Sequence, residues 1–185
     1  RLEGEYFKDR TKDIEALSQK IYDEHISHIK ETDTTAPYSS GEFSYYRRTV
    51  KGQSYKIHCR VPKGEEAGGD KEEVLLDENK LAEGKSHCSV YSVKSSPDHK
   101  LVAYSVDFQG DELYTIKFLG DAVKDEITNT NGSIVFGTDN SVIFYTTKDE
   151  AKRDYKVWRH VIGEPQASDK CLATEDDEIY SIGCG

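Results

Sequence analysis

The stretch that decides the fold is LVAY at Leu101–Tyr104 with YTI at Tyr114–Ile116, because both pieces recur at one distance. The copies are VIFY at Val142–Tyr145 and YKV at Tyr155–Val157, each 41 residues further along the chain. A weaker copy, with FSYY and YKI, lies upstream within Phe43–Ile57. Repeats of about 40 residues built from strands and turns are typical of propeller blades. The sequence therefore predicts a partial β-propeller.

Strands can be assigned within each repeat, because runs rich in Tyr, Val, Ile and Thr alternate with turn-forming Gly, Asp, Asn and Ser. The outer strand of the first copy is expected at Glu73–Asp77, and Ile179–Ile182 is expected to open a new blade. In the second and third copies, strands are expected up to Val93 and at Leu101–Asp107, Tyr114–Phe118, Glu126–Asn129, Ile134–Phe136, Val142–Thr147, Tyr155–His160 and Lys170–Thr174. The expected fold is mainly β, with about two and a half four-stranded blades in residues 39–185.

An amphipathic helix is expected upstream of the blades, from Thr11 to Glu31. Its apolar residues recur at steps of three and four and form one stripe. They are Ile14, Leu17, Ile21, Tyr22, Ile26 and Ile29. Thr11 is a candidate N-cap, and Pro37 disfavours helix at the residue before it. Residues 1–38 are therefore predicted to form a helical arm.

Composition excludes several partners. The chain has 185 residues, of which 35% are hydrophobic and 32% charged, with a net charge of −10. An acidic surface repels nucleic-acid phosphates and anionic membranes, so neither is expected as a partner. No apolar run approaches the ~18 residues of a membrane span, and the first ten residues do not resemble a signal peptide. The expected location is cytoplasmic, or organellar if a leader is missing.

Neither a disulfide framework nor a metal or cofactor site is expected. The four cysteines, Cys59, Cys88, Cys171 and Cys184, form no C-x-x-C pair and are interpreted as reduced thiols. His25 and His28 are three residues apart on the predicted helix, without the H-E-x-x-H order of zinc proteases or a third ligand. They are interpreted as solvated helix-face histidines.

Several segments resemble, in the right order, the prolyl oligopeptidase family and its oligopeptidase B branch in particular. Near the arm they are Ile29–Asp33 and Ala36–Tyr38. In the blades they are Glu73–Asn79 with Leu81–Gly84, Val93–Asp98 with Leu101–Tyr104, Val157–His160 with Ile162–Gly163, and Asp176–Glu178. The Trp158–His160 and Glu73–Asn79 pieces are the more specific ones, since Ser-Pro-Asp occurs in many propellers.

The resemblance implies a serine peptidase made of an α/β-hydrolase domain and a seven-bladed propeller that caps its active site. Relatives cleave short peptides, oligopeptidase B after Arg or Lys and prolyl oligopeptidase after Pro. Short, basic peptides are therefore the expected substrates. This chain would match roughly the N-terminal quarter, with its arm packed on the hydrolase domain and its blades acting as a size filter.

No catalytic residue is assigned to this sequence. It contains no G-x-S-x-G nucleophile elbow, and the Ser, Asp and His of the family belong to the C-terminal domain. Two alternatives to a peptidase remain open: a stand-alone propeller that binds partners, and a catalytically inactive family member. The 185 residues alone are predicted to be inactive, and marginally folded or prone to aggregation, since blades are stabilised by their neighbours.

Three remaining motifs have simpler structural interpretations. Asn131–Ser133 is a formal glycosylation sequon, but Asn-Gly between strands also favours a tight turn. Glu175–Glu178 is interpreted as a solvated acidic loop, with attraction of basic peptides as the alternative. Trp158 is interpreted as a core or blade-interface residue.

Overall fold

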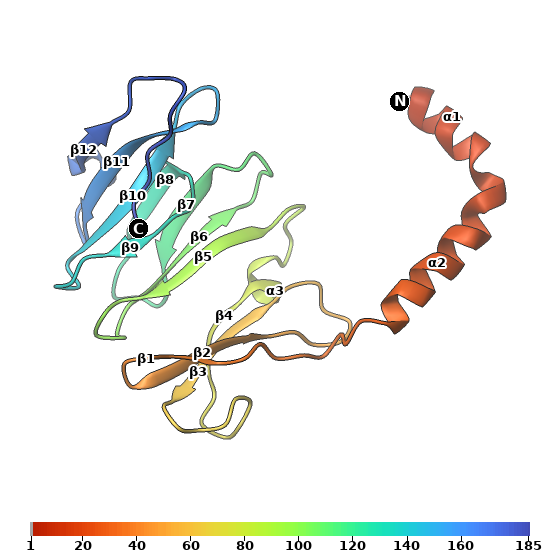
Figure 1. Cartoon of the computed structure of the whole chain (residues 1–185), viewed down its shortest axis with the longest axis horizontal. Coiled ribbons are helices and arrows are strands. Elements are labelled where there is room, and N and C mark those ends of the chain that lie inside the picture. Colours follow the sequence, from red (N-terminus) through yellow and green to blue (C-terminus); the bar gives the residue numbers. More distant parts are fainter. Residues whose placement is uncertain (1) are drawn as a thin grey trace.

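The body of the computed structural model, which describes residues 2–185, consists of a four-stranded and an eight-stranded antiparallel sheet (Figure 1). The eight-stranded sheet divides into two sets of four strands that are joined through the pair Thr130 and Thr147, so the body contains three blades. The first blade contains β1 (Tyr38–Ser40), β2 (Phe43–Arg48), β3 (Ile57–Pro62) and β4 (Glu73–Asp77). The second contains β5 (Ser89–Ser95), β6 (Val102–Asp107), β7 (Tyr114–Phe118) and β8 (Glu126–Thr130). The third contains β9 (Val135–Phe136), β10 (Val142–Lys148), β11 (Asp154–Val161) and β12 (Lys170–Thr174). The mainly β, blade-like architecture predicted from the repeat is confirmed.

The strand count differs from the expectation at both ends of the body. Tyr38, expected at the end of the arm, begins β1 and completes a fourth strand in the first blade. Ile179–Ile182, expected to be an inner strand, lies in no strand. A strand needs a ladder of backbone partners. Here the Ile182 amide donates to the Asp154 carbonyl at 3.1 Å, but the Tyr180 amide bonds locally to the Asp177 carbonyl, so no ladder forms.

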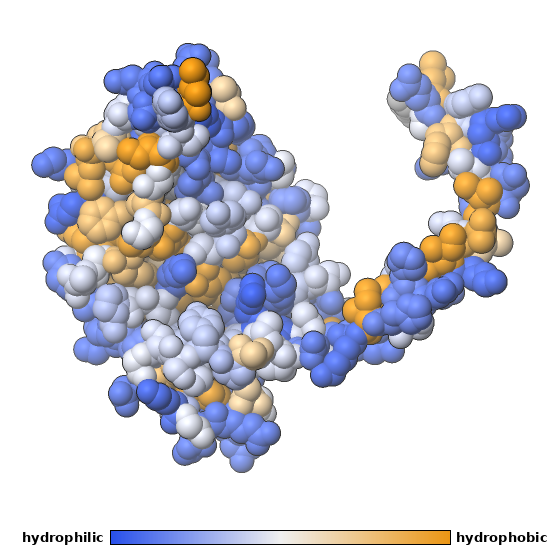
Figure 2. Space-filling model, in the orientation of Figure 1, coloured by the Kyte–Doolittle hydropathy of each residue, from blue (hydrophilic) through white to orange (hydrophobic). Residues whose placement is uncertain are grey.

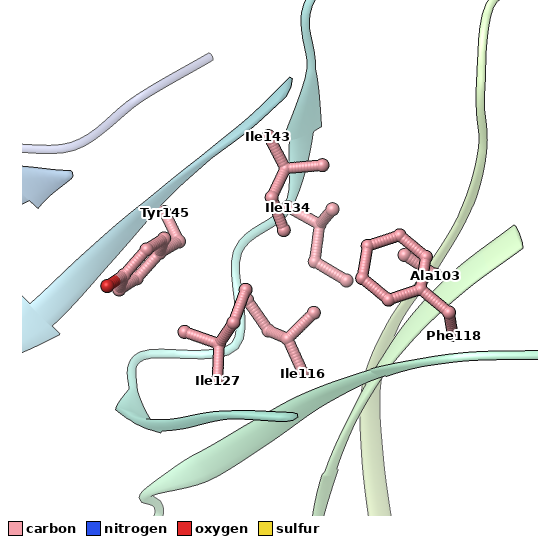
Figure 3. Close-up of a cluster of buried hydrophobic side chains, with 7 residues drawn as sticks. All are labelled: Ala103, Ile116, Phe118, Ile127, Ile134, Ile143 and Tyr145. Carbon is pink, nitrogen blue, oxygen red and sulfur yellow. The ribbon is translucent and has the colours of Figure 1, made fainter. Parts of the chain in front are cut away.

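The main core lies where the second and third blades face each other (Figure 3). Seven buried side chains from β6, β7, β8, β10 and the segment before β9 form it. They are Ala103, Ile116, Phe118, Ile127, Ile134, Ile143 and Tyr145. A second cluster, with Leu76, Cys88, Tyr104 and Val106, joins the first and second blades. Because the second blade has a neighbour on each side, all six residues of β6 are buried.

The N-terminal arm consists of two helices, α1 (Leu2–Arg10) and α2 (Glu15–Ser27), joined by the short 3-10 helix η1 (Lys12–Ile14). The prediction of one helix starting at Thr11 is wrong. The Thr11 hydroxyl donates a hydrogen bond back to the Phe7 carbonyl, 2.8 Å away, and caps no following turn. Thr11 therefore closes α1 rather than opening α2.

The arm extends away from the blades, and neither of its helices has a buried residue (Figure 1). Its apolar side chains form an exposed band along the helices (Figure 2). Leu17 and Ile21 in the predicted stripe are 55% and 46% exposed. Among residues 2–185, no helix is long and apolar enough to cross a membrane.

Two short helical turns complete the body. The helix α3 (Glu78–Leu81) directly follows β4, and the Asp77 carboxylate caps it by accepting a bond from the Asn79 amide. The 3-10 turn η2 (Gln166–Ser168) lies between β11 and β12.

Candidate functional site

A groove of about 760 Å³ lies where the first strands of the three blades converge. The residues that line it include Tyr38 and Ser40 of β1, Tyr91–Ser95 of β5 and Val135–Phe136 of β9. Each of these strands has its backbone hydrogen-bonded to a neighbour on one side only. The other edge of each strand therefore offers amide and carbonyl groups to the groove. We call this surface the inner-strand groove.

Tyrosine rings stand at the surface of the inner-strand groove. Tyr38 is 63% exposed and stacks on Tyr45, with 5.7 Å between ring centroids. Tyr91 is 61% exposed and lies on Tyr114, at 5.4 Å. A Cβ at Gly132 would lie 2.9 Å from the Tyr91 ring, so glycine is required for this contact. The groove thus presents aromatic faces and hydroxyls to a ligand.

Polar contacts between turns fix the first blade against the second. The Tyr45 hydroxyl lies 2.7 Å from His99 Nδ1, and Arg60 Nη1 donates to the His99 carbonyl at 2.8 Å. A different contact joins the corresponding turns of the next pair of blades, where the Asp98 amide donates to Asn140 Oδ1. His99 and Asn140 both have positive φ angles, 61° and 62°, which are uncommon outside Gly, Asn, Asp and His.

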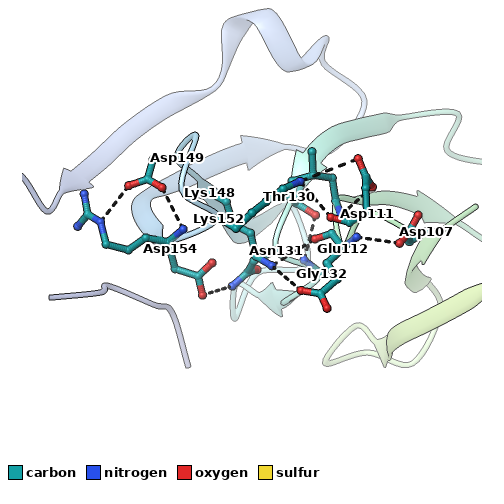
Figure 4. Close-up of polar contacts among 12 residues, drawn as sticks. Asp107, Asp111, Glu112, Thr130, Asn131, Gly132, Lys148, Asp149, Lys152 and Asp154 are labelled. Atoms are coloured by element: carbon teal, nitrogen blue, oxygen red, sulfur yellow. Dashed lines mark hydrogen bonds and ion pairs between the residues drawn. The ribbon is translucent and has the colours of Figure 1, made fainter. Parts of the chain in front are cut away.

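At the opposite ends of the strands, two lysines join the second and third blades (Figure 4). Lys148 Nζ donates to the Glu112 carbonyl at 3.3 Å, and Lys152 Nζ donates to the Asp111 carbonyl at 3.0 Å. The turn between β6 and β7, which carries these two carbonyls, is held by the buried carboxylate of Asp107, which accepts bonds from three backbone amides. Burial alone would raise the pKa of Asp107, but these amides lower it below its usual value.

In the third blade, the imidazole of His160 is fully buried between two carboxylates. Nδ1 lies 2.7 Å from Asp169 Oδ1, and Nε2 lies 3.0 Å from Asp125 Oδ2. The Tyr145 hydroxyl donates to the other oxygen of Asp169, and burial followed by this bond raises the Tyr145 pKa. Because the ring is closed to solvent and both nitrogens contact carboxylates, this group links β11 to the segments on either side of it.

Trp158 belongs to the same blade interface, as predicted. It packs against the main core, stacks on Tyr145 at a centroid distance of 6.5 Å, and donates from Nε1 to the Thr147 hydroxyl. The Trp158–His160 segment therefore has a packing role.

The other candidates from the sequence also have structural roles. Within residues 2–185, no group of three or more His, Cys, Asp or Glu side chains could hold a metal ion, and both His25 and His28 are exposed. The Asn131 side chain accepts a bond from the Ser133 amide, and Gly132 has φ 96°, so this segment forms a tight turn. Three carbonyls within residues 175–180 accept bonds from Arg153, which fixes the acidic segment to the third blade.

The cysteines of the described chain are free thiols. Burial raises the pKa of Cys59 to about 11, so its thiol stays protonated and unreactive at neutral pH. Cys88 is also buried, whereas Cys171 is exposed.

Comparison with known proteins identifies the family. The family described as "Prolyl oligopeptidase, N-terminal beta-propeller domain" matches the chain over residues 1–185. The chain belongs to this family. The propeller domain is 34% identical to dipeptidyl aminopeptidase BI of Pseudoxanthomonas mexicana, over 93% of this chain and 26% of that protein.

Two solved structures of oligopeptidase B are similar to the propeller domain. The enzyme from Trypanosoma brucei has 56% identity and a TM-score of 0.94, covering 97% of this chain and 26% of that one. The enzyme from Leishmania major has 49% identity and a TM-score of 0.91, and the match covers 95% of this chain and 25% of that one. The resemblance read from the sequence is confirmed, and the propeller domain spans about a quarter of the length of these relatives.

Sequence reasoning missed the inner-strand groove. Its walls come from three different repeats, and two of the strands, β1 and β9, have only three and two residues. A three-residue strand such as β1 carries no alternation of apolar and polar residues that a pattern could detect, whereas β9 was expected at Ile134–Phe136. The repeat itself was the available signal, because four-stranded blades place their first strands around a common channel.

Proposed function

We propose that the full-length protein is a serine-type oligopeptidase and that residues 39–185 form the first blades of a propeller that caps and filters its active site. The observation that carries this proposal is the family match over the whole chain, with 56% identity to an oligopeptidase B. Packed blades leave only a narrow central channel, so a propeller placed over an active site admits short peptides and excludes folded proteins.

The catalytic groups are proposed to lie outside this sequence, in a C-terminal α/β-hydrolase domain. Two observations support this placement: the chain contains no G-x-S-x-G elbow, and it spans about a quarter of its relatives' length. The propeller domain itself excludes folded proteins from the active site and positions short peptides on their way to it. It takes no part in bond cleavage.

The N-terminal arm is proposed to attach to that hydrolase domain. Its apolar band packs against no other part of residues 2–185. In α2, Leu17, Ile21 and Tyr22 are all exposed. An exposed apolar helix face of this kind marks a contact surface. The hydrolase domain is the partner that the family resemblance implies.

Cleavage after Arg or Lys is the proposed specificity. The relatives with 56% and 49% identity are both oligopeptidase B, and the first was solved with antipain covalently bound. The net charge of −10 also favours the approach of basic peptides. A reducing compartment such as the cytoplasm suits the free thiols and is the proposed location.

The test is hydrolysis of chromogenic peptides by the full-length protein. Substrates that end in Arg or Lys are expected to be cleaved, and a serine-directed inhibitor is expected to abolish the reaction. Cleavage of a Pro substrate alone would instead assign prolyl specificity. If none of these peptides is cleaved although the full sequence carries the nucleophile elbow, the protein is an inactive member of the family.

A further inference from the structure

The inner-strand groove differs in charge from the rest of the chain. Acids outnumber bases by 35 to 25 in the sequence, yet none of the residues lining the groove is Asp or Glu. Arg47 of β2 and Lys94 of β5 line the groove, and the side chains of both are exposed. In the part of the chain that the structure describes, neither forms an ion pair.

The charge of Arg47 acts inside the groove. Partial burial of the Tyr38 phenol raises its pKa, with a smaller contribution from Tyr45, and the positive charge of Arg47 opposes both effects. Arg47 also pairs across the ladder with His58, and both residues line the groove. The imidazole of His58 is occupied, since its Nε2 lies 2.6 Å from Glu78 Oε1.

The remaining lining suits a peptide. Tyr38 and Tyr91 present exposed rings and hydroxyls, and the edges of β1 and β5 carry backbone groups that form no ladder on the groove side. An extended peptide can hydrogen-bond to such an edge while its side chains meet the tyrosines. A volume of about 760 Å³ lies within the ~300–1,000 Å³ range of small-ligand sites.

We propose that the inner-strand groove binds carboxylate groups of short peptides, with Arg47 and Lys94 as the cations that hold them. Because each first strand has a free edge at the groove, a peptide held there by its carboxylates can also hydrogen-bond to the strand backbone. The inference rests on the blade architecture and the lining of the groove, and it does not require peptidase activity.

The test measures binding of fluorescent peptides to the full-length protein after treatment with a serine-directed inhibitor, so that the active site does not contribute. The probes are an amidated six-residue glutamate peptide, the matching lysine peptide, and a neutral Gly-Ser peptide with either a free or an amidated C-terminus. The glutamate peptide is expected to bind more tightly than the lysine peptide, and more weakly as salt is added.

The variants are R47E, K94E and the double variant, with K170E on the outer strand β12 as the matched control. Lys170 is exposed and lies outside the groove lining. Loss of one exposed ion pair weakens binding of the glutamate peptide by up to about fivefold, and each charge reversal is expected to weaken it by at least as much, because it also adds repulsion. The double variant should lose about tenfold or more, and K170E should bind as the parent does.

Thermal unfolding shows whether each charge-reversal variant still folds. If one does not, the neutral substitutions R47Q and K94Q replace it in the binding measurement. Binding of the neutral peptide only with a free C-terminus, and its loss in the double variant, would assign the terminal carboxylate as the bound group. Equal binding of the glutamate and lysine peptides, or unchanged binding in the double variant, would overturn the proposal. Because binding is measured without turnover, this failure is distinguishable from the absence of peptidase activity.

Discussion

At the residue scale, the buried His160 gives the Trp158–His160 segment its structural role. Its side chain is completely enclosed, and the side chains of Asp125 and Asp169 that flank it are only 11% and 1% exposed. Removing the partner of a buried charge costs more than the pair contributes, because the remaining charge stays desolvated. The three side chains are therefore interdependent.

We expect His160→Gln to destabilise the third blade by about 1–3 kcal/mol, since it removes ring contacts to two carboxylates and leaves at least one of them without its buried hydrogen-bond partner. Hydrogen exchange of the β10 and β11 amides in the full-length protein measures this effect locally. His28→Gln is the control, because His28 is exposed on the arm. Equal protection of these amides in the two variants would show that the buried cluster contributes nothing.

Two glycines with the same kind of backbone conformation allow the cost of backbone strain to be measured apart from the cost of side-chain crowding. Gly132 and Gly163 have similar φ angles, 96° and 93°, but only Gly132 has a neighbour, Tyr91, in the space that a Cβ would fill. Gly163→Ala is expected to cost about 1 kcal/mol from the left-handed backbone alone. Gly132→Ala should cost about 1–3 kcal/mol more, because the Tyr91 ring must move. Equal unfolding midpoints for the two variants would contradict the close Gly132–Tyr91 contact.

At the element scale, the sequence predicted most strands well, the two-residue β9 included, and missed β1 and the short helix α1. The strands β6, β7, β10 and β11 carry the tyrosine repeat and were found close to their observed bounds. The helix α1 was missed, because Leu2, Tyr6 and Phe7 do not continue the stripe of α2. The groove could not be assigned, because contacts between distant repeats leave no local pattern in the sequence.

The apolar band of the arm leads to a prediction for the full-length protein. Replacing Leu17 and Ile21 together by Ser removes two apolar side chains from the proposed contact with the hydrolase domain. Burial of each such side chain is worth about 1.5–3 kcal/mol, so the arm should detach more often and be cut faster by a protease. Lys20→Ser is the control, since Lys20 is an exposed residue of the same helix. Equal cleavage rates for the double variant and this control would mean that the arm is free in the whole protein.

At the scale of the whole molecule, the blades depend on their neighbours. Strand β6 is buried on both faces because blades flank it, whereas four of the five residues of the outer strand β12 are exposed. The isolated 185 residues are therefore predicted to unfold over a broad temperature range and to aggregate. Calorimetry of the purified 185 residues checks this, and a sharp, reversible transition of a monomer would contradict it.

The central claim is that this domain filters access to a serine peptidase site. The most direct test compares the rate at which the full-length protein cleaves one Arg-containing sequence as a free short peptide and within a folded protein. The account predicts efficient, serine-inhibitor-sensitive cleavage of the short peptide and none of the folded protein. Comparable cleavage of both, or cleavage of neither, would contradict it.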